Sequence, residues 1–415
     1  MPQLSNFNSV NQYLSRFYEN SRVEYSLDNM RRLMKYLDNP QDQLRVIHVA
    51  GTSGKTSTAY YIAGILSKGG YKTGLTVSPH VDHLNERVQL NGQPISENDF
   101  CDAISRFLGL IANSPIKPSW FEVVVAFAYW YFCEQKVEYA VVEVGLGGLK
   151  DGTNVVHHAD KVCVITDIGF DHVGVLGNTL AEIAEQKAGI IQPGNVVFTY
   201  RQPNEVMDAI KRKTESVNGK LKVVDDFHPN NFQKRNWHLA HAVYEYVGER
   251  DNLRYLTSQE LEATKQIVIP GRMDIRKIGG KTLIMDGAHN VQKMTAFLKR
   301  FNELFPAAKP AILIGVKEGK EYKELVPLLK PLASRVITTS FESSQDLPIK
   351  SMDAEELAKE FITQGLKTKA VPDHQEALRI LLKCPEEVLL ITGSFYLLGQ
   401  IRRDDILLTH DKKIK

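Results

Sequence analysis

Short apolar runs alternate with helix-length segments along most of this chain. Two of the intervening stretches, 122–134 and 354–364, have apolar positions at helical spacing. Parallel strands that are buried on both faces read as continuous apolar runs, and helices connect them. The pattern therefore predicts an α/β fold with mainly parallel sheets. The strand candidates are 45–50, 139–144, 162–167, 196–200, 282–285, 311–315, 335–339 and 388–391.

A domain boundary is predicted near Ile269-Pro270-Gly271-Arg272. A polar stretch, 252–265, precedes these residues, and a new series of strand, turn and helix follows them. Proline next to glycine is typical of a stiff hinge between domains. The sequence thus predicts an N-terminal and central domain over 1–268 and a smaller, Rossmann-like α/β domain over 269–415.

Composition narrows the class of protein. The chain has 415 residues, 43% hydrophobic and 24% charged, with a net charge of +2, which fits a globular protein and gives no field that would attract nucleic acid. None of the four cysteines forms a C-x-x-C pair, which favours reduced thiols. The longest apolar run, 123–133, is too short to span a bilayer, and the N-terminus lacks the pattern of a secretion signal. We therefore expect a cytoplasmic protein with neither membrane nor nucleic acid as a partner.

The stretch H-V-A-G-T-S-G-K-T-S at 48–57 carries the strongest chemical signal. It lies between a predicted strand and a helix-like stretch over 57–68. Such a turn presents backbone N–H groups at a helix N-terminus, where anions bind. Lys55 can bind the β- and γ-phosphates, and the Thr56 hydroxyl can reach a phosphate-bound Mg²⁺. The stretch predicts a nucleoside triphosphate site, although Val49 occupies the first glycine position of the full P-loop pattern.

Polar side chains also follow other predicted strands, where ligands of open α/β sheets bind. Glu143 stands between a strand and a glycine turn, and suits a hard cation. His172 lies in the turn after 162–167 and could bind a metal through a neutral imidazole. Ser78 could donate one oxygen but is weak evidence alone. Asp286 could accept hydrogen bonds from a ribose, and a plain Asp-Gly turn explains it equally well.

Taken together, these motifs resemble the folylpolyglutamate synthase/dihydrofolate synthase family of the Mur ligase superfamily. The family carries the compact form G-T-x-G-K-[TG]-S, which matches 51–57 here. The resemblance runs in order from about Ser26 to the segment 392–399. Its other blocks are Ser78-Pro79-His80, Glu86-Arg87, Phe121-Glu122, 143–154, 171–190, Pro270-Gly271-Arg272 and 286–290.

The resemblance implies ATP-dependent amide ligation through an acyl phosphate, with ATP and two Mg²⁺ ions. It implies ATP, L-glutamate and dihydropteroate or a reduced folate as small-molecule partners, and it favours a monomer. Lys55, Lys187 and His172 would be catalytic, with Lys187 carbamylated to supply an anionic oxygen near the second metal. The other roles it implies are phosphate binding by Gly51, Thr52, Gly54, Lys55, Thr56 and Ser57; metal binding by Thr56, Ser78, Glu143 and His172; further ATP contacts from Asn236, Arg272, Asp286 and His289; and substrate contacts from Phe121, Glu122, Lys150, Asp151 and Gly152. Because Arg272 and Asp286 lie on or beyond the hinge, domain closure is expected to complete the site.

Departures from the family pattern leave the acceptor open. Leu149 takes the place of an arginine and Gln186 that of a glutamate, Ser119-Trp120 replaces threonine-tyrosine, and Val291 replaces a proline. One alternative is a Mur-type ligase with another acceptor, which Thr56 favours slightly, whereas Ser78-Pro79-His80 favours the folate branch. The other alternative is a nucleotide-binding protein that has lost ligase activity. The retained lysines and metal-site residues argue against this second alternative.

Overall fold

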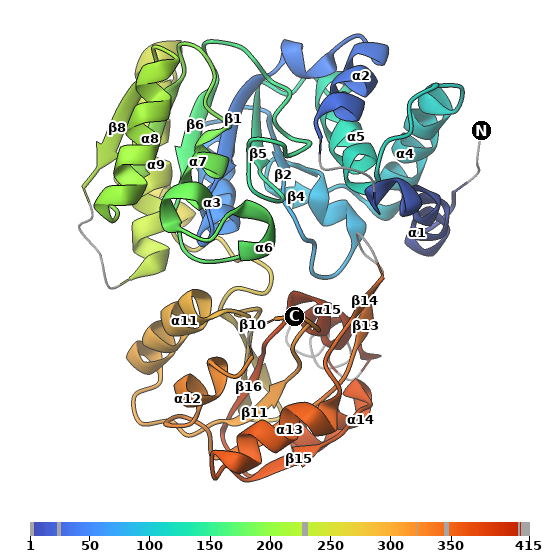
Figure 1. The fold of residues 1–415 in the computed structure, drawn as a ribbon, viewed down its shortest axis with the longest axis vertical. Coiled ribbons are helices and arrows are strands. Elements are labelled where there is room, and N and C mark those ends of the chain that lie inside the picture. The colour runs from blue at the N-terminus through green and yellow to red at the C-terminus, as the bar shows by residue number, and fades with distance from the viewer. Residues whose placement is uncertain are drawn as a thin grey trace. The chain divides into compact units, whose positions relative to one another are not determined.

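The computed structural model describes residues 4–22, 26–225, 231–320, 322–343, 348–405 and 407. It confirms the predicted α/β class, with two separate and mainly parallel sheets (Figure 1). Contacts between Cα atoms divide the chain into two compact units. The first takes Met1–Pro79 and Leu84–Ile267, and the second takes His80–His83 and Val268–Lys415.

The first unit is built on an eight-stranded sheet. Six neighbouring strands, from β2 to β8 in the list below, run parallel, while β3 and β4 form an antiparallel extension at one edge. β2, β5, β6 and β7 are buried along their whole length, as parallel strands covered by helices on both faces should be. The strand order is β4 (Gln93–Pro94), β3 (Gln89–Leu90), β2 (Thr73–Thr76), β5 (Tyr139–Glu143), β1 (Arg45–Ala50), β6 (Val162–Ile165), β7 (Val196–Tyr200) and β8 (Lys220–Val224).

Helices and short 3₁₀ turns cover this sheet. α5 begins two residues earlier than predicted, because Ser119 and Glu122 form a capping box before the apolar run. The α-helices are α1 (Phe7–Leu14), α2 (Asp28–Tyr36), α3 (Lys55–Lys68), α4 (Glu97–Ile111), α5 (Trp120–Glu134), α6 (Val173–Leu176), α7 (Leu180–Ala188), α8 (Asn204–Ser216), α9 (Phe232–Asp251) and α10 (Ser258–Thr264). The 3₁₀ turns are Ser15–Phe17, Glu19–Arg22, Pro40–Gln43 and Leu84–Arg87.

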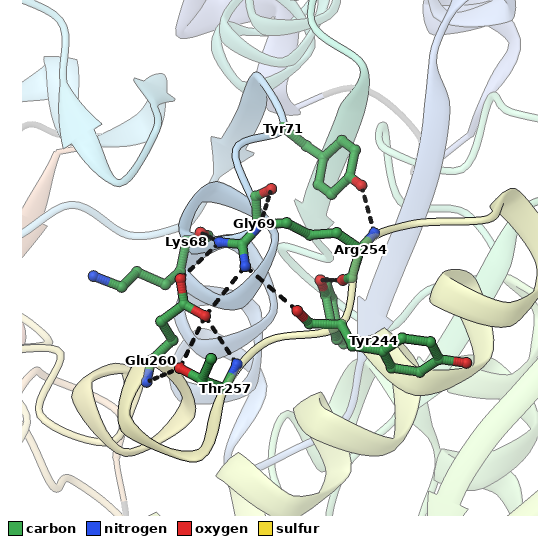
Figure 2. A network of polar contacts seen from close by, with 8 residues as sticks. Lys68, Gly69, Tyr71, Tyr244, Arg254, Thr257 and Glu260 are labelled. Carbon is green, nitrogen blue, oxygen red and sulfur yellow. Dashed lines mark hydrogen bonds and ion pairs between the residues drawn. The ribbon is translucent and has the colours of Figure 1, made fainter.

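An arginine from the segment after α9 closes the C-terminal end of α3, the helix that follows the glycine-rich turn (Figure 2). Arg254 Nη2 donates to the carbonyl of Lys68 at 2.9 Å, and its Nε donates to that of Gly69 at 3.2 Å. The guanidinium also pairs with Glu260, whose carboxylate caps α10. The Tyr244 hydroxyl donates to the Arg254 carbonyl at 2.8 Å. A cation at a helix C-terminus donates hydrogen bonds to carbonyls that have no partner within the helix. Its positive charge also interacts favourably with the negative end of the helix dipole.

The second unit holds a six-stranded sheet in which only β9 is antiparallel to its neighbour, among the strands described. Two apolar cores cover its faces. The strand order is β15 (Thr368–Ala370), β12 (Arg335–Thr338), β11 (Ala311–Ile314), β16 (Val388–Thr392), β10 (Lys281–Asp286) and β9 (Asp274–Ile278), with a separate pair β13 (Glu342–Ser343) and β14 (Ile349–Lys350). The helices are α11 (Val291–Leu304), α12 (Leu325–Leu329), α13 (Ala354–Thr363), α14 (His374–Lys383) and α15 (Phe395–Arg402).

The segment His80–His83 packs with the second unit, although the sequence division placed it in the first domain. Val81 is buried in a core of that unit, and Arg402 of α15 donates Nε and Nη2 to the two carboxylate oxygens of Asp82 at 2.7 Å each. Gly399 lets α15 approach, since a side chain there would overlap the Val81 carbonyl. A four-residue segment that joins a distant part of the chain through a buried valine and an ion pair has no signature in a sequence.

Two further expectations concern the whole chain. All four cysteines are free, as predicted, and three of them are buried. Within the part of the chain that the structure describes, no helix combines the length and apolar character needed to cross a bilayer.

Candidate functional site

The predicted nucleotide-binding turn joins the end of β1 to the start of α3. The helix begins at Lys55, two residues earlier than the sequence suggested. Gly51 has φ +147° and Gly54 has φ +88°, values that side chains disfavour. A Cβ at Gly51 would overlap Thr166 Oγ1, and one at Gly54 would lie 2.9 Å from Asn236 Oδ1. Both glycines are therefore required by backbone conformation and by close neighbours.

Groups at the ends of β6 and α7 fix the backbone of this turn. The N–H groups of Thr52 and Ser53 donate to the Asp167 carbonyl at 2.7 and 3.2 Å. Thr166 Oγ1 donates to the Ser53 carbonyl at 2.8 Å. Lys187, buried in the last turn of α7, donates Nζ to the Gly51 carbonyl at 2.8 Å. These hydrogen bonds fix the backbone of the turn. The first N–H groups of α3 have no partner inside the helix and can bind an anion.

We expect Gly51→Ala to lower the free energy of unfolding of the first unit by about 2–4 kcal/mol, as backbone strain and overlap with Thr166 combine. Gly70→Ala is a matched control, because Gly70 has φ +91° with open space around it, and should cost only about 1–2 kcal/mol of backbone strain. Urea unfolding followed by circular dichroism measures both. Equal losses in the two variants would contradict the steric role of Thr166.

Three of the four predicted metal ligands meet at the end of β5. Glu143 pairs in register with Val49 of β1, which places its carboxylate beside the glycine-rich turn. Thr56 Oγ1 donates to Glu143 Oε1 at 2.8 Å, and the Ser78 N–H donates to Oε2 at 3.2 Å. A buried carboxylate that contacts the Thr56 hydroxyl and the backbone of Ser78 offers the oxygen ligands that Mg²⁺ prefers.

The donor set therefore fits a magnesium ion that keeps other ligands. The residues described contain no group of three or more His, Cys, Asp or Glu side chains able to hold a metal. Such a site suits a cation that shares its coordination with waters and substrate phosphates, as Mg²⁺ does. His172, the fourth predicted ligand, has φ +52° at the start of α6, and its Nε2 lies 3.7 Å from Asp171 Oδ1. Its imidazole is 45% exposed, and its role in binding a metal stays a prediction.

Asp151, a predicted substrate contact, is hydrogen-bonded within its own turn. Its carboxylate is buried and accepts hydrogen bonds from the N–H groups of Leu146 (2.7 Å) and Thr153 (3.0 Å), and from Thr153 Oγ1 (2.5 Å). Burial raises its pKa. Because the Thr153 hydroxyl donates to Asp151, it accepts from His48 Nε2, 2.8 Å away. Through Thr153 and His48, Asp151 therefore connects the glycine turn after Glu143 to the strand that precedes the P-loop, and its contact with a substrate stays a prediction.

The other predicted substrate residues surround the same turn. The Phe121 ring packs so closely on Gly145 and Gly152 that a Cβ on Gly145 would lie 2.5 Å from its Cζ. Glu122 accepts from the Ser119 N–H at 2.7 Å, and its pKa is raised mainly by burial. Lys150 is exposed. These contacts explain the glycines and give Glu122 a capping function that the family motif alone did not reveal.

Leu149, the residue in the arginine position, links this turn to the helix of Lys187. Its N–H donates to the Gln186 carbonyl at 2.8 Å, and its side chain is 41% exposed. The two departures from the family pattern, Leu149 and Gln186, are therefore in contact, and Gln186 directly precedes Lys187. The hydrogen bond between them joins backbone atoms, so it does not depend on either side chain.

Two groups of candidate ATP contacts lie in different units. Asn236 of α9 belongs to the first unit and lies beside Gly54 of the turn. In the second unit, the Asp286 carboxylate accepts from the N–H groups of Met273 and Ala288 at 2.9 Å each, and burial raises its pKa. The Arg272 guanidinium lies 4.2 Å from the centre of the Phe395 ring. His289 Nδ1 is 2.9 Å from the Gly287 carbonyl. Arg272 and His289 both contact the Phe395 ring, and the charge of Arg272 lowers the pKa of Asp286 against the effect of burial, so the three residues form one cluster.

Sequence reasoning missed Thr166 and Tyr200. Thr166 follows β6 and Tyr200 ends β7, and the only available signal was that polar groups at the carboxyl ends of parallel strands gather at one edge.

Comparison with known proteins gives consistent results. The model of the family "Mur ligase, glutamate ligase domain" matches residues 271–395. The chain is 32% identical over 418 residues to dihydrofolate synthetase of Saccharomyces cerevisiae, covering 92% of this chain and 98% of that protein. It is 28% identical to dihydrofolate synthase/folylpolyglutamate synthase of Bacillus subtilis, covering 92% and 95%. The bifunctional folylpolyglutamate synthase/dihydrofolate synthase of Yersinia pestis, crystallised with AMPPNP and a manganese ion, has the same fold, with a TM-score of 0.82, 23% identity and coverage of 97% and 98%. With this similarity over nearly the full length of both chains, and with the P-loop, Glu143 and Lys187 brought together, the chain belongs to the folylpolyglutamate synthase/dihydrofolate synthase family of Mur-type ligases.

Proposed function

We propose that this protein is an ATP-dependent ligase that adds L-glutamate to the carboxylate of a folate-type acceptor. The observation that carries the proposal is the meeting of a P-loop turn, Glu143 and buried Lys187 at the carboxyl ends of β1, β5 and β6. A nucleotide-binding switch needs only the P-loop turn. Transfer of a phosphoryl group to a carboxylate also needs further groups, such as Glu143 and Lys187, that help to neutralise the charge of the phosphate and the acceptor. The names of the relatives support the same activity.

The residues act mainly by positioning and by charge. Lys55 and the N–H groups at the start of α3 hold the β- and γ-phosphates in line with the acceptor carboxylate. A carboxylate oxygen attacks the γ-phosphorus and ADP leaves, which gives an acyl phosphate. The amine of glutamate then attacks the carbonyl carbon, loses a proton and expels phosphate, forming the amide. A divalent cation held by Thr56, Ser78 and Glu143, with His172 proposed for a second ion, would neutralise the phosphate charge.

Lys187 is proposed to act as its carbamate. The neutral amine attacks carbon dioxide, a nitrogen–carbon bond forms and one proton is released, which leaves an anionic group with one N–H. That N–H can still donate to the Gly51 carbonyl, the partner of Nζ in the structure. The new carboxylate oxygens supply a hard anionic ligand that an unmodified lysine lacks.

The acceptor is tested by phosphate release with ATP, Mg²⁺ and L-glutamate, together with mass spectrometry of the products. One glutamyl unit gained on dihydropteroate shows dihydrofolate synthase activity, and units gained on tetrahydrofolate show polyglutamylation. We expect phosphate release to require both the acceptor and glutamate. Product with a peptidoglycan precursor alone would favour another Mur-type acceptor, and ATP turnover that ignores both co-substrates would overturn the ligase assignment.

A further inference from the structure

The amide of Asn236 lies against the turn that is proposed to bind ATP. Asn236 is buried near the start of α9, and a Cβ built on Gly54 would lie 2.9 Å from its Oδ1 and 3.2 Å from its Nδ2. An amide can present either its oxygen or its NH₂ group to a neighbour. The two orientations have opposite consequences here. The amide oxygen would repel a hydrogen-bond acceptor atom of the nucleotide, whereas the NH₂ group would donate a hydrogen bond to that atom.

The hydroxyl of Tyr200 decides between these orientations. Tyr200 is the last residue of β7 and is buried, and its hydroxyl lies 2.7 Å from Asn236 Oδ1, to which it donates. Oδ1 is thereby used inside the protein. Nδ2 of Asn236 donates to no atom of the described residues, so both its hydrogens stay available beside the turn.

The surroundings of Tyr200 favour this donor role. The Arg235 guanidinium lies 4.0 Å from the centre of the Tyr200 ring, and a cation over an aromatic face draws electron density from the ring, which makes the hydroxyl a better donor. Arg235 Nη2 also pairs with Asp167 Oδ1 at 2.5 Å, and both side chains are nearly buried. Asp167 is the residue whose carbonyl accepts the N–H groups of Thr52 and Ser53. Tyr200 therefore belongs to a connected support for the turn.

We propose that Tyr200 is a positioning residue for the nucleotide: its hydroxyl holds the Asn236 amide with Nδ2 towards the P-loop turn, where it donates to an acceptor atom of ATP. The inference deepens the proposed function and rests on it. Tyr200 itself touches no substrate in this role. Its contribution passes through Asn236, and the two residues should therefore behave as one unit.

The test is a double-mutant cycle on binding of AMPPNP, measured by calorimetry on the full-length protein with Mg²⁺. Tyr200→Phe keeps the ring under Arg235 and removes only the hydroxyl. We expect the Kd for AMPPNP to rise about three- to tenfold in Tyr200→Phe and about tenfold in Asn236→Ala, the range of one hydrogen bond. In the double variant the Kd should equal that of Asn236→Ala. In turnover, the KM for ATP should rise while the KM for glutamate and kcat stay near those of the wild type.

Tyr244→Phe is the matched control. It removes the hydroxyl of another buried tyrosine of the first unit, whose partner is the carbonyl of Arg254, the residue whose guanidinium caps α3 (Figure 2). Both Phe variants should lower Tm slightly, and only Tyr200→Phe should weaken AMPPNP binding. Unchanged binding in Tyr200→Phe, or losses that add in the double variant, would overturn the positioning role while the ligase assignment stands. A wild-type protein that binds no AMPPNP would overturn both.

Discussion

Replacing Lys187 by alanine is expected to lower kcat for glutamate ligation by about a hundred- to a thousandfold, the loss typical of a group that stabilises transition-state charge. Binding of AMPPNP should change little, because the contacts that hold the turn from Thr166 and Asp167 remain. Phosphate release in the presence of all substrates measures kcat, and calorimetry measures binding. The variant thereby separates loss of chemistry from loss of the nucleotide.

Lys187→Arg distinguishes the carbamate from a simple cation. Arginine keeps a positive charge and N–H donors for the Gly51 carbonyl, but its guanidinium cannot react with carbon dioxide. We therefore expect Lys187→Arg to be as inactive as Lys187→Ala, with Tm and AMPPNP binding confirming that it folds. Lys161→Met controls for the removal of a buried lysine, since Lys161 Nζ donates only to the Val156 and Ile190 carbonyls among the contacts described, and it should lower stability more than turnover. Activity retained in Lys187→Arg would overturn the carbamate role.

The central strands could be predicted because their burial forces an apolar composition. β1 and β7 have the predicted bounds, and the other predicted strands differ by one or two residues at one or both ends. The bounds of β2 were not predicted, although Ser78 was placed at a strand end, because Thr73 and Gly74 interrupt its apolar pattern and a four-residue strand offers little else. β8 and β9 are partly exposed and mix charged with apolar positions, so no continuous run marks them.

The candidate site was predictable where chemistry dictates residue type, and less so where neighbours decide the role. The P-loop glycines, Thr56 and Glu143 could be found from their order along the chain, and the structure places them together. The hydrogen bonds of Asp151 within its turn could not be predicted, because which backbone N–H groups a carboxylate accepts depends on the fold of the turn around it. Tyr200 gave only the weak signal of a polar group at the carboxyl end of a strand, since an aromatic residue there is ordinarily part of a core.

Removing the charge of Glu143 should have an effect as large as that at Lys187, for a different reason. In Glu143→Gln the amide can still accept from Thr56 Oγ1, but its NH₂ group then faces the Ser78 N–H, donor against donor. We expect kcat to fall about a hundredfold or more and the Mg²⁺ concentration for half-maximal rate to rise, because the buried anionic ligand is lost.

A Mg²⁺ titration of phosphate release separates this effect from misfolding. Glu143→Asp keeps the charge on a shorter side chain, and it should recover part of the rate at high Mg²⁺, whereas Glu143→Gln should not. Glu260→Gln is the control, because Glu260 is a carboxylate of the same unit that pairs with Arg254 and accepts from the Thr257 N–H. This variant should leave the Mg²⁺ dependence unchanged. If Glu143→Gln kept the wild-type Mg²⁺ dependence, Glu143 would serve only to join Thr56 to Ser78, and the cation would have to be held elsewhere. Because the Glu143 carboxylate is buried and already accepts two hydrogen bonds, the Mg²⁺ titration distinguishes a metal ligand from a structural hydrogen-bond acceptor.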